Sequence, residues 1–182
     1  MRNTQLGSLS KTVLVVAVVC GMLVAPTAAQ TATTVTFDSS SETVDGSTTV
    51  SLLATDVPAD SSIGAYELNL TYNSDVVSLS VTGTDRYDVS TETTGSSGTV
   101  TTTVVGYTGA SDGDGGNTTL ATVTVNSEGN SGDTTLDVST VETFSDTDSN
   151  AVGYSIGASL GLSVDTGDGG GNGGFVSGGG GG

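Results

Sequence analysis

Apolar and polar residues alternate in short runs between residues 33 and 165, and this period of two most constrains the fold. In the clearest run Tyr66, Leu68, Leu70 and Tyr72 alternate with polar residues. Such alternation is typical of a β-strand with one buried face. Similar runs, rich in Thr and Val, occupy residues 33–37, 48–57, 76–81, 99–107, 120–125, 134–141, 152–156 and 160–164. Thr and Val favour strands because their branched side chains suit a pleated, half-exposed surface.

The connections between these runs indicate how the strands pair. Gly, Asn, Asp and Ser separate the runs, and no amphipathic helical pattern lies between them. Parallel neighbours usually need a long, helical crossover, so we expect antiparallel pairing. The sequence therefore predicts an all-β domain, an antiparallel β-sandwich of about nine strands.

The two ends of the chain differ from this central region. Arg2 and Lys11 precede an apolar run at residues 13–24, and small residues up to Ala29 suit a cleavage site. The alternative is a retained membrane anchor, but the apolar run is shorter than the roughly 20 residues that a spanning helix needs. Residues 166–182 contain eleven glycines, which is typical of a flexible linker. We expect a signal peptide at 1–29, a sandwich at 30–165 and a linker at 166–182.

The charge is strongly one-sided. All 20 Asp and Glu residues lie beyond residue 30, whereas Arg86 is the one basic residue after Ala29, which leaves a net charge of about −19. Phosphate groups repel such a surface, so we exclude nucleic acid and, after cleavage, a membrane as partners. Molar salt shortens the Debye length to about 3 Å and screens the self-repulsion. We expect a secreted or cell-surface protein of an extreme halophile, a haloarchaeon; the alternative is an ordinary acidic secreted domain.

The residue inventory of the mature chain excludes most catalytic sites. It has no His for a Ser-His-Asp triad, and no Cys or His for an ordinary zinc or iron site. It also has no Lys for a Schiff base or a phosphate loop. A carboxylate pair for glycoside hydrolysis stays open, but the chain has no Trp to hold a sugar. We expect a protein that is not an enzyme and needs no cofactor.

Two acidic loops, with the patterns D-x-D-x-x-N and D-x-D-x-N, offer closely spaced oxygen ligands of the kind that Ca²⁺ requires. The candidate ligands are Asp112, Asp114 and Asn117 in the first loop and Asp146, Asp148 and Asn150 in the second. Neither loop completes an EF-hand, because Val123 and Gly157 stand where the bidentate Glu is needed. Calcium binding is one interpretation; the other, which we favour, is a solvated acidic turn.

Two sequons for N-glycosylation are present. They are Asn69-Leu-Thr71 and Asn117-Thr-Thr119. We expect Asn69 on the exposed face of its strand and Asn117 on a loop, and the loop position favours Asn117 for modification.

The aromatic residues bear on sugar binding. Tyr66 and Tyr72 share a face with Leu68 and Leu70, so we expect them in the core, together with Phe37 and Phe144. The tyrosines that we expect to be exposed are Tyr87, Tyr107 and Tyr154. Three scattered rings make a weak platform for stacking on a polysaccharide.

Several segments resemble cohesin domains. Residues 63–79 are similar to the family's third and fourth strands, in which an alternating strand is followed by Tyr-Asp-Pro and an apolar pair; here Asn73 and Ser74 replace the Asp and Pro. Residues 119–125 (TLATVTV) resemble the later Leu-Ala-x-Val strand, and residues 144–164 resemble the closing hairpin. The resemblance covers most of residues 33–165 and implies a nine-stranded jelly-roll sandwich.

The resemblance also implies a function. Cohesins dock dockerin modules through one exposed sheet face and do no chemistry, so it implies a docking module outside the cell, in polysaccharide degradation, whose partner's loops hold calcium. The docking face would consist of Glu67, Asn69, Thr71, Val104, Gly106 and Tyr107. The alternative for each of them is a simple solvent-facing residue. Two other functions stay open: a carbohydrate-binding module of the same fold, marked by a planar row of exposed tyrosines, and a structural or adhesin domain of a longer chain.

Overall fold

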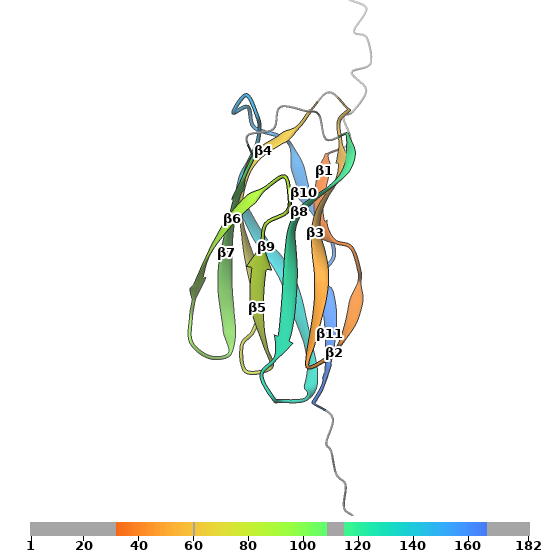
Figure 1. Ribbon diagram of the computed structural model, residues 1–182, viewed down its shortest axis with the longest axis vertical. Helices are drawn as coiled ribbons and strands as arrows, with labels where there is room; N and C mark the ends of the chain where they lie inside the picture. Colours follow the sequence, from red (N-terminus) through yellow and green to blue (C-terminus); the bar gives the residue numbers. More distant parts are fainter. Residues whose placement is uncertain (1–31, 60, 109–114, 167–182) are drawn as a thin grey trace, which may run out of the picture.

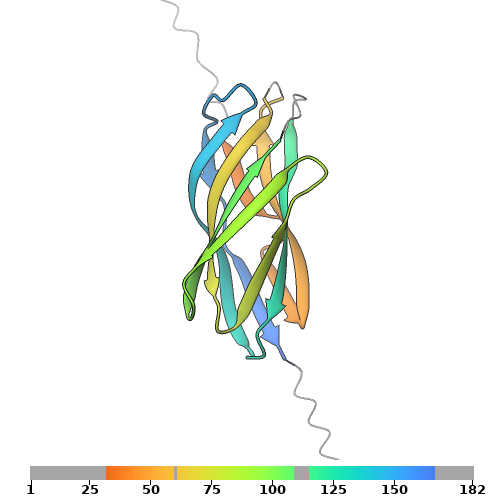
Figure 2. The ribbon, with the colours of Figure 1, turned by 60° about the vertical axis from the view of Figure 1, so that its left-hand side comes forward.

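The computed structural model describes residues 32–59, 61–108 and 115–166. Every regular element in them is a β-strand, and eleven strands form two sheets packed face to face (Figures 1 and 2). One sheet has the order β10-β1-β3-β8-β5, and the other has the order β2-β11-β9-β4-β7-β6. The all-β jelly-roll sandwich expected from the sequence is confirmed, whereas the predicted signal peptide and most of the glycine-rich linker lie outside the described residues.

The strands, in chain order, are β1 (Thr33–Phe37), β2 (Ser41–Asp45), β3 (Ser47–Val57), β4 (Ile63–Asn73), β5 (Val77–Thr82), β6 (Asp88–Thr94), β7 (Thr99–Tyr107), β8 (Gly116–Ser127), β9 (Gly132–Asp146), β10 (Tyr154–Ile156) and β11 (Leu160–Asp165). Nine of them correspond to the nine predicted runs. The remaining two, β2 and β6, were not predicted, and each forms one edge of the six-stranded sheet. No helix in the described part of the chain is long and apolar enough to cross a membrane.

Most strand pairs are antiparallel, but two are parallel, which corrects the expectation of antiparallel pairing throughout. β1 pairs with β10, and β2 pairs with β11, in parallel. These pairs join strands from the two ends of the domain, as the 3.0 Å hydrogen bond between the hydroxyls of Thr34 and Ser155 illustrates. The intervening strands return the chain to the same end of the sandwich, so no helical crossover is needed.

The core lies between the sheets and follows the alternation in the sequence. On β4, Tyr66, Leu68, Leu70 and Tyr72 are buried, as predicted, and so are Phe37 and Phe144 elsewhere in the core. The Tyr66 hydroxyl crosses the sandwich and donates a 2.7 Å hydrogen bond to the carbonyl of Leu120 on β8. A β-bulge leaves Leu120 without a Cα partner on β3, so this hydroxyl supplies a donor at an interruption of the ladder. Burial, and then the neighbouring Tyr87, raises the pKa of Tyr66 above its usual range.

Tyr87 is buried, which corrects the prediction that its side chain is exposed. Its hydroxyl donates a 3.0 Å hydrogen bond to the carbonyl of Ile63. Its ring meets the ring of Tyr66 edge to face, with 5.6 Å between centroids. Both ends of this amphipathic side chain therefore find partners inside the sandwich.

Candidate functional site

The surface predicted to dock a partner is the outer face of the six-stranded sheet, which we call the outer face. On β4, the half-buried Glu67, Asn69 and Thr71 alternate with fully buried core residues. A strand sends successive side chains to opposite sides of its sheet. These three residues therefore point away from the core, as expected.

The neighbouring strand β7 corrects part of the predicted face. Val104 pairs with Leu68 and Gly106 pairs with Tyr66, so both lie on the core side. Val104 is fully buried. At Gly106, an added Cβ would come within 2.1 Å of the Tyr66 ring, so the absence of a side chain makes room for this ring. Neither residue belongs to the outer face.

The outward residues of β7 lie one position away from those predicted. Val105 pairs with Glu67, and Tyr107 pairs with Ala65. Val105 is 37% exposed and Tyr107 is 57% exposed, so Tyr107 was placed correctly and Val105 was missed. We call these two residues the β7 pair. Because they are two positions apart on one strand, they form a small apolar area on the outer face.

Hydrogen bonds across the strands fix the polar side chains beside this area. Asn69 donates from Nδ2 to the Thr140 hydroxyl on β9 at 2.8 Å. The Thr103 hydroxyl on β7 donates to Asn69 Oδ1 at 2.7 Å. One amide thus links three adjacent strands and holds two hydroxyls in place. A partner would meet an ordered row of polar groups.

The charged residues on the strands beside the β7 pair are acidic. Asp88 on β6 lies opposite Tyr107, and Glu92 lies opposite Thr103. Glu67 flanks Val105 on the other side. The strands β4, β6, β7 and β9 contain no Lys or Arg in their described residues. The outer face therefore combines a small apolar centre with carboxylates and hydroxyls.

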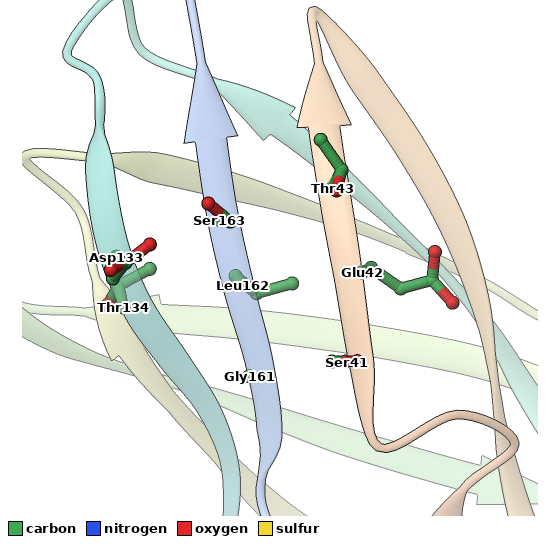
Figure 3. Close-up of a pocket in the computed structure, with 8 residues that line it drawn as sticks. All are labelled: Ser41, Glu42, Thr43, Asp133, Thr134, Gly161, Leu162 and Ser163. Atoms are coloured by element: carbon green, nitrogen blue, oxygen red, sulfur yellow. The ribbon is translucent and has the colours of Figure 1, made fainter.

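A shallow depression lies at the other end of the same sheet (Figure 3). It has a volume of about 600 Å³ and is formed by three adjacent strands, β2, β11 and β9. Its lining residues are Ser41, Glu42, Thr43, Asp133, Thr134, Gly161, Leu162 and Ser163. Gly161 contributes no side chain between Ser41 on β2 and Thr135 on β9. The lining offers hydroxyls and two carboxylates but no His, Cys or Lys, so it is suited to hydrogen bonding.

Hydrogen bonds within the second acidic loop, residues 146–150, fix the carboxylate of Asp146. Asp146 Oδ1 accepts from the backbone amides of Asp148 at 2.9 Å and Asn150 at 2.7 Å, and Oδ2 accepts from Asn150 Nδ2 at 3.0 Å. The side-chain amide of Asn150, together with the backbone amides of Asn150 and Asp148, holds the pKa of Asp146 below its usual value. Both carboxylate oxygens of Asp146 therefore already accept hydrogen bonds from within the loop.

The structure describes only part of the first acidic loop. Asp112 and Asp114 lie outside the described residues, and Asn117 is the exposed second residue of β8, where a loop was expected. The described part of the chain contains no group of three or more His, Cys, Asp or Glu side chains that could hold a metal ion. Calcium binding and a solvated acidic turn stay the two interpretations of each loop, with the solvated turn favoured.

The exposed tyrosines do not form a row. Tyr107 lies on β7 of the six-stranded sheet, and Tyr154 lies on β10 at the edge of the five-stranded sheet. Tyr154 is 41% exposed, donates its hydroxyl to the carbonyl of Val141 at 2.8 Å and contacts Phe144 edge to face. Within the described residues, the planar tyrosine platform that would mark a carbohydrate-binding module is therefore absent.

The comparison with solved structures decides the type of fold. No protein-family model matches the chain, and no curated protein matches it. A cohesin module from a family 33 glycoside hydrolase of Clostridium perfringens is similar over 75% of this chain and 98% of its own length, with a TM-score of 0.60 and 16% identity. The chain has the cohesin fold. The resemblance seen in the sequence is thereby confirmed at the level of the fold.

Two further cohesin structures show the range of this similarity. The sixth cohesin of scaffoldin B from Acetivibrio cellulolyticus, solved in complex with a Cel5 dockerin, matches with a TM-score of 0.56 and 13% identity over 74% of this chain and 100% of its own. A non-cellulosomal cohesin from the archaeon Archaeoglobus fulgidus matches with a TM-score of 0.51 and 18% identity over 75% of this chain and 93% of its own. At these identities the similarity establishes the architecture alone.

Proposed function

We propose that this chain is a secreted, non-catalytic docking module that binds a protein partner through the outer face. The observation that carries the proposal is the β7 pair, an apolar area at the surface of a sheet whose fold is that of cohesin modules. Cohesins solved in complex with dockerins support a dockerin-like partner. The polysaccharide-degrading context and the halophilic, extracellular setting belong to the same proposal.

The geometry indicates how such binding would work. Tyrosines are enriched among the residues that contribute most to binding at protein interfaces, and Tyr107 is the most exposed large apolar residue of the described chain. The hydroxyls of Thr103 and Thr140 are already held by Asn69, so binding loses little side-chain entropy there. β4 is paired on both sides, by β7 and β9, so its backbone groups are occupied. Side chains would therefore carry the recognition.

The test is capture of a partner by the immobilised domain. The source organism's own secreted proteins would be passed over it at multimolar salt, with and without calcium. We expect a protein with paired Asp/Asn calcium loops to be retained in the presence of calcium. Retention should be lost with Tyr107→Ser and kept with Ile156→Ser, a control that removes an apolar residue 42% exposed on β10 of the other sheet.

Two results would refute the proposal. One is a bound protein that both variants retain equally, since its interface would then lie elsewhere. The other is an isolated polysaccharide that pelleted with the domain while no secreted protein bound to it, since that would establish the carbohydrate-binding alternative.

A further inference from the structure

The two sequons occupy positions of different accessibility, and this difference assigns a modification site. We propose that Asn117 is N-glycosylated and that Asn69 is not. In the reaction, Asn117 Nδ2 forms a bond to the anomeric carbon of an oligosaccharide carried on a lipid phosphate. The bond from that carbon to the phosphate oxygen breaks, the lipid phosphate leaves with the electron pair, and one amide proton passes to a base of the transferase.

Asn117 is open to a transferase on several sides. Its side chain is exposed and makes no hydrogen bond to any described residue. β5 pairs with β8 only from Thr122 to Ser127, so among the described residues β3 is the one strand that pairs with β8 near Asn117. The pairing with that neighbour, β3, is itself irregular between Ala54 and Val57, opposite this segment. The sequon therefore begins on a weakly held stretch of backbone.

The chain preceding and following Asn117 also suits the modification. Gly116, the first residue of β8, has a φ of +94°, a conformation that residues with a side chain rarely adopt, so the backbone just before Asn117 departs from regular strand geometry. Thr119, the third residue of the sequon, is two positions further along the strand. Residues two apart on a strand project to the same side. The Asn117 amide and the Thr119 hydroxyl thus face one enzyme together.

Asn69 is much less accessible to a transferase than Asn117. It lies in the middle of β4, where it pairs with Thr103 on β7 and Thr140 on β9. Its Nδ2, which would receive the sugar, donates to the Thr140 hydroxyl, and its Oδ1 accepts from the Thr103 hydroxyl. A transferase would have to break these hydrogen bonds and lift a central strand out of the sheet.

The location of Asn117 has a consequence for docking. β8 belongs to the five-stranded sheet, so a sugar on Asn117 leaves the outer face of the six-stranded sheet uncovered. A sugar on Asn69 would stand in the middle of that face. This consequence rests on the proposed docking function, whereas the modification of Asn117 does not.

The experiment is peptide mapping of the protein secreted by its own source organism. Trypsin is unsuitable because no Lys or Arg follows Arg86. Cleavage before aspartate gives one peptide per sequon, residues 60–74 with Asn69 and residues 114–132 with Asn117. We expect mass spectrometry to find a sugar mass on 114–132 and the bare mass for 60–74.

Variants expressed in the same host separate the sequon from the asparagine. Thr119→Ala retains Asn117 but destroys the sequon, so the sugar mass should be lost; Thr119→Ser keeps the sequon and should keep the sugar. A bare 114–132 peptide from the native protein, a sugar on 60–74, or a sugar that survives Thr119→Ala would each overturn the proposal. Binding of a partner by unglycosylated protein would leave the docking function standing, so the two ideas fail separately.

Discussion

Val104→Thr should destabilise the domain, because it places a hydroxyl in the core at nearly constant volume. Val104 is fully buried and pairs with Leu68, another buried residue. Burying a hydroxyl without a hydrogen-bond partner costs about 1–3 kcal/mol in proteins. For a domain of this size, that cost lowers the melting temperature by roughly 4–12 °C. Thermal unfolding followed by circular dichroism at constant high salt measures the change.

The adjacent residue provides the matched control. Val105 lies on the same strand, 37% exposed, on the outer face. The same substitution, Val105→Thr, puts its hydroxyl in water, so stability should change by less than about 0.5 kcal/mol. It should instead weaken binding of the captured partner, because the β7 pair loses apolar area. If Val105→Thr lowered the melting temperature and Val104→Thr did not, Val105 would face the core and Val104 the solvent. The pairing of β7 with β4 would then differ by one residue, and the outer face would contain the other set of β7 residues.

Three further outcomes follow from the same contacts. Gly106→Ala should destabilise the domain by about 1–3 kcal/mol through overpacking, because its Cβ would come within 2.1 Å of the Tyr66 ring; in a Tyr66→Leu background the added cost should shrink, and an equal cost in both backgrounds would contradict this contact. Tyr66→Phe should cost about 1–2 kcal/mol in urea unfolding, as the buried Leu120 carbonyl loses its donor. Asp146 has a lowered pKa in the folded chain, so the stability that its carboxylate contributes is complete above the unfolded-state pKa and is lost as the pH falls through the folded-state pKa. The difference in unfolding free energy between wild type and Asp146→Asn should therefore vanish in that acidic range. A difference that did not depend on pH would refute this role of Asp146.

The alternation of residues was enough to predict nine strands, and it failed at the edges of the six-stranded sheet. β6 has no fully buried residue, and β2 has just one, Val44. An edge strand of this kind is held by backbone pairing, β6 with β7 and β2 with β11, rather than by an apolar face. Backbone pairing leaves no pattern in the sequence of the strand itself, so only the three-dimensional register reveals β2 and β6.

The sequence of β7 does not show which of its alternate residues face the core. Val104 and Val105 are adjacent, so one of them must break the alternation, and the threonines before them fit either face. Tyr107 belongs to the set of alternate residues that faces outward, and the buried Val100 belongs to the set that faces the core. The choice is made by pairing with β4, whose own phase is unambiguous. The outward side of β4 was therefore predicted correctly and that of β7 only in part, while a docking role for these residues stays a prediction.

The carboxylates on the outer face determine how docking must respond to salt. Glu67, Asp88 and Glu92 surround the β7 pair, with no basic residue on these strands. At 0.1 M salt the Debye length is about 10 Å, so these charges act across an interface, whereas at 1 M it is about 3 Å and they scarcely do. A basic partner would lose affinity as salt rises, and an acidic partner from the same saline environment would gain it. The sign of the change in affinity with salt concentration therefore identifies the charge of the partner. Neutralising the three carboxylates should reduce this salt dependence only if the partner binds to the outer face.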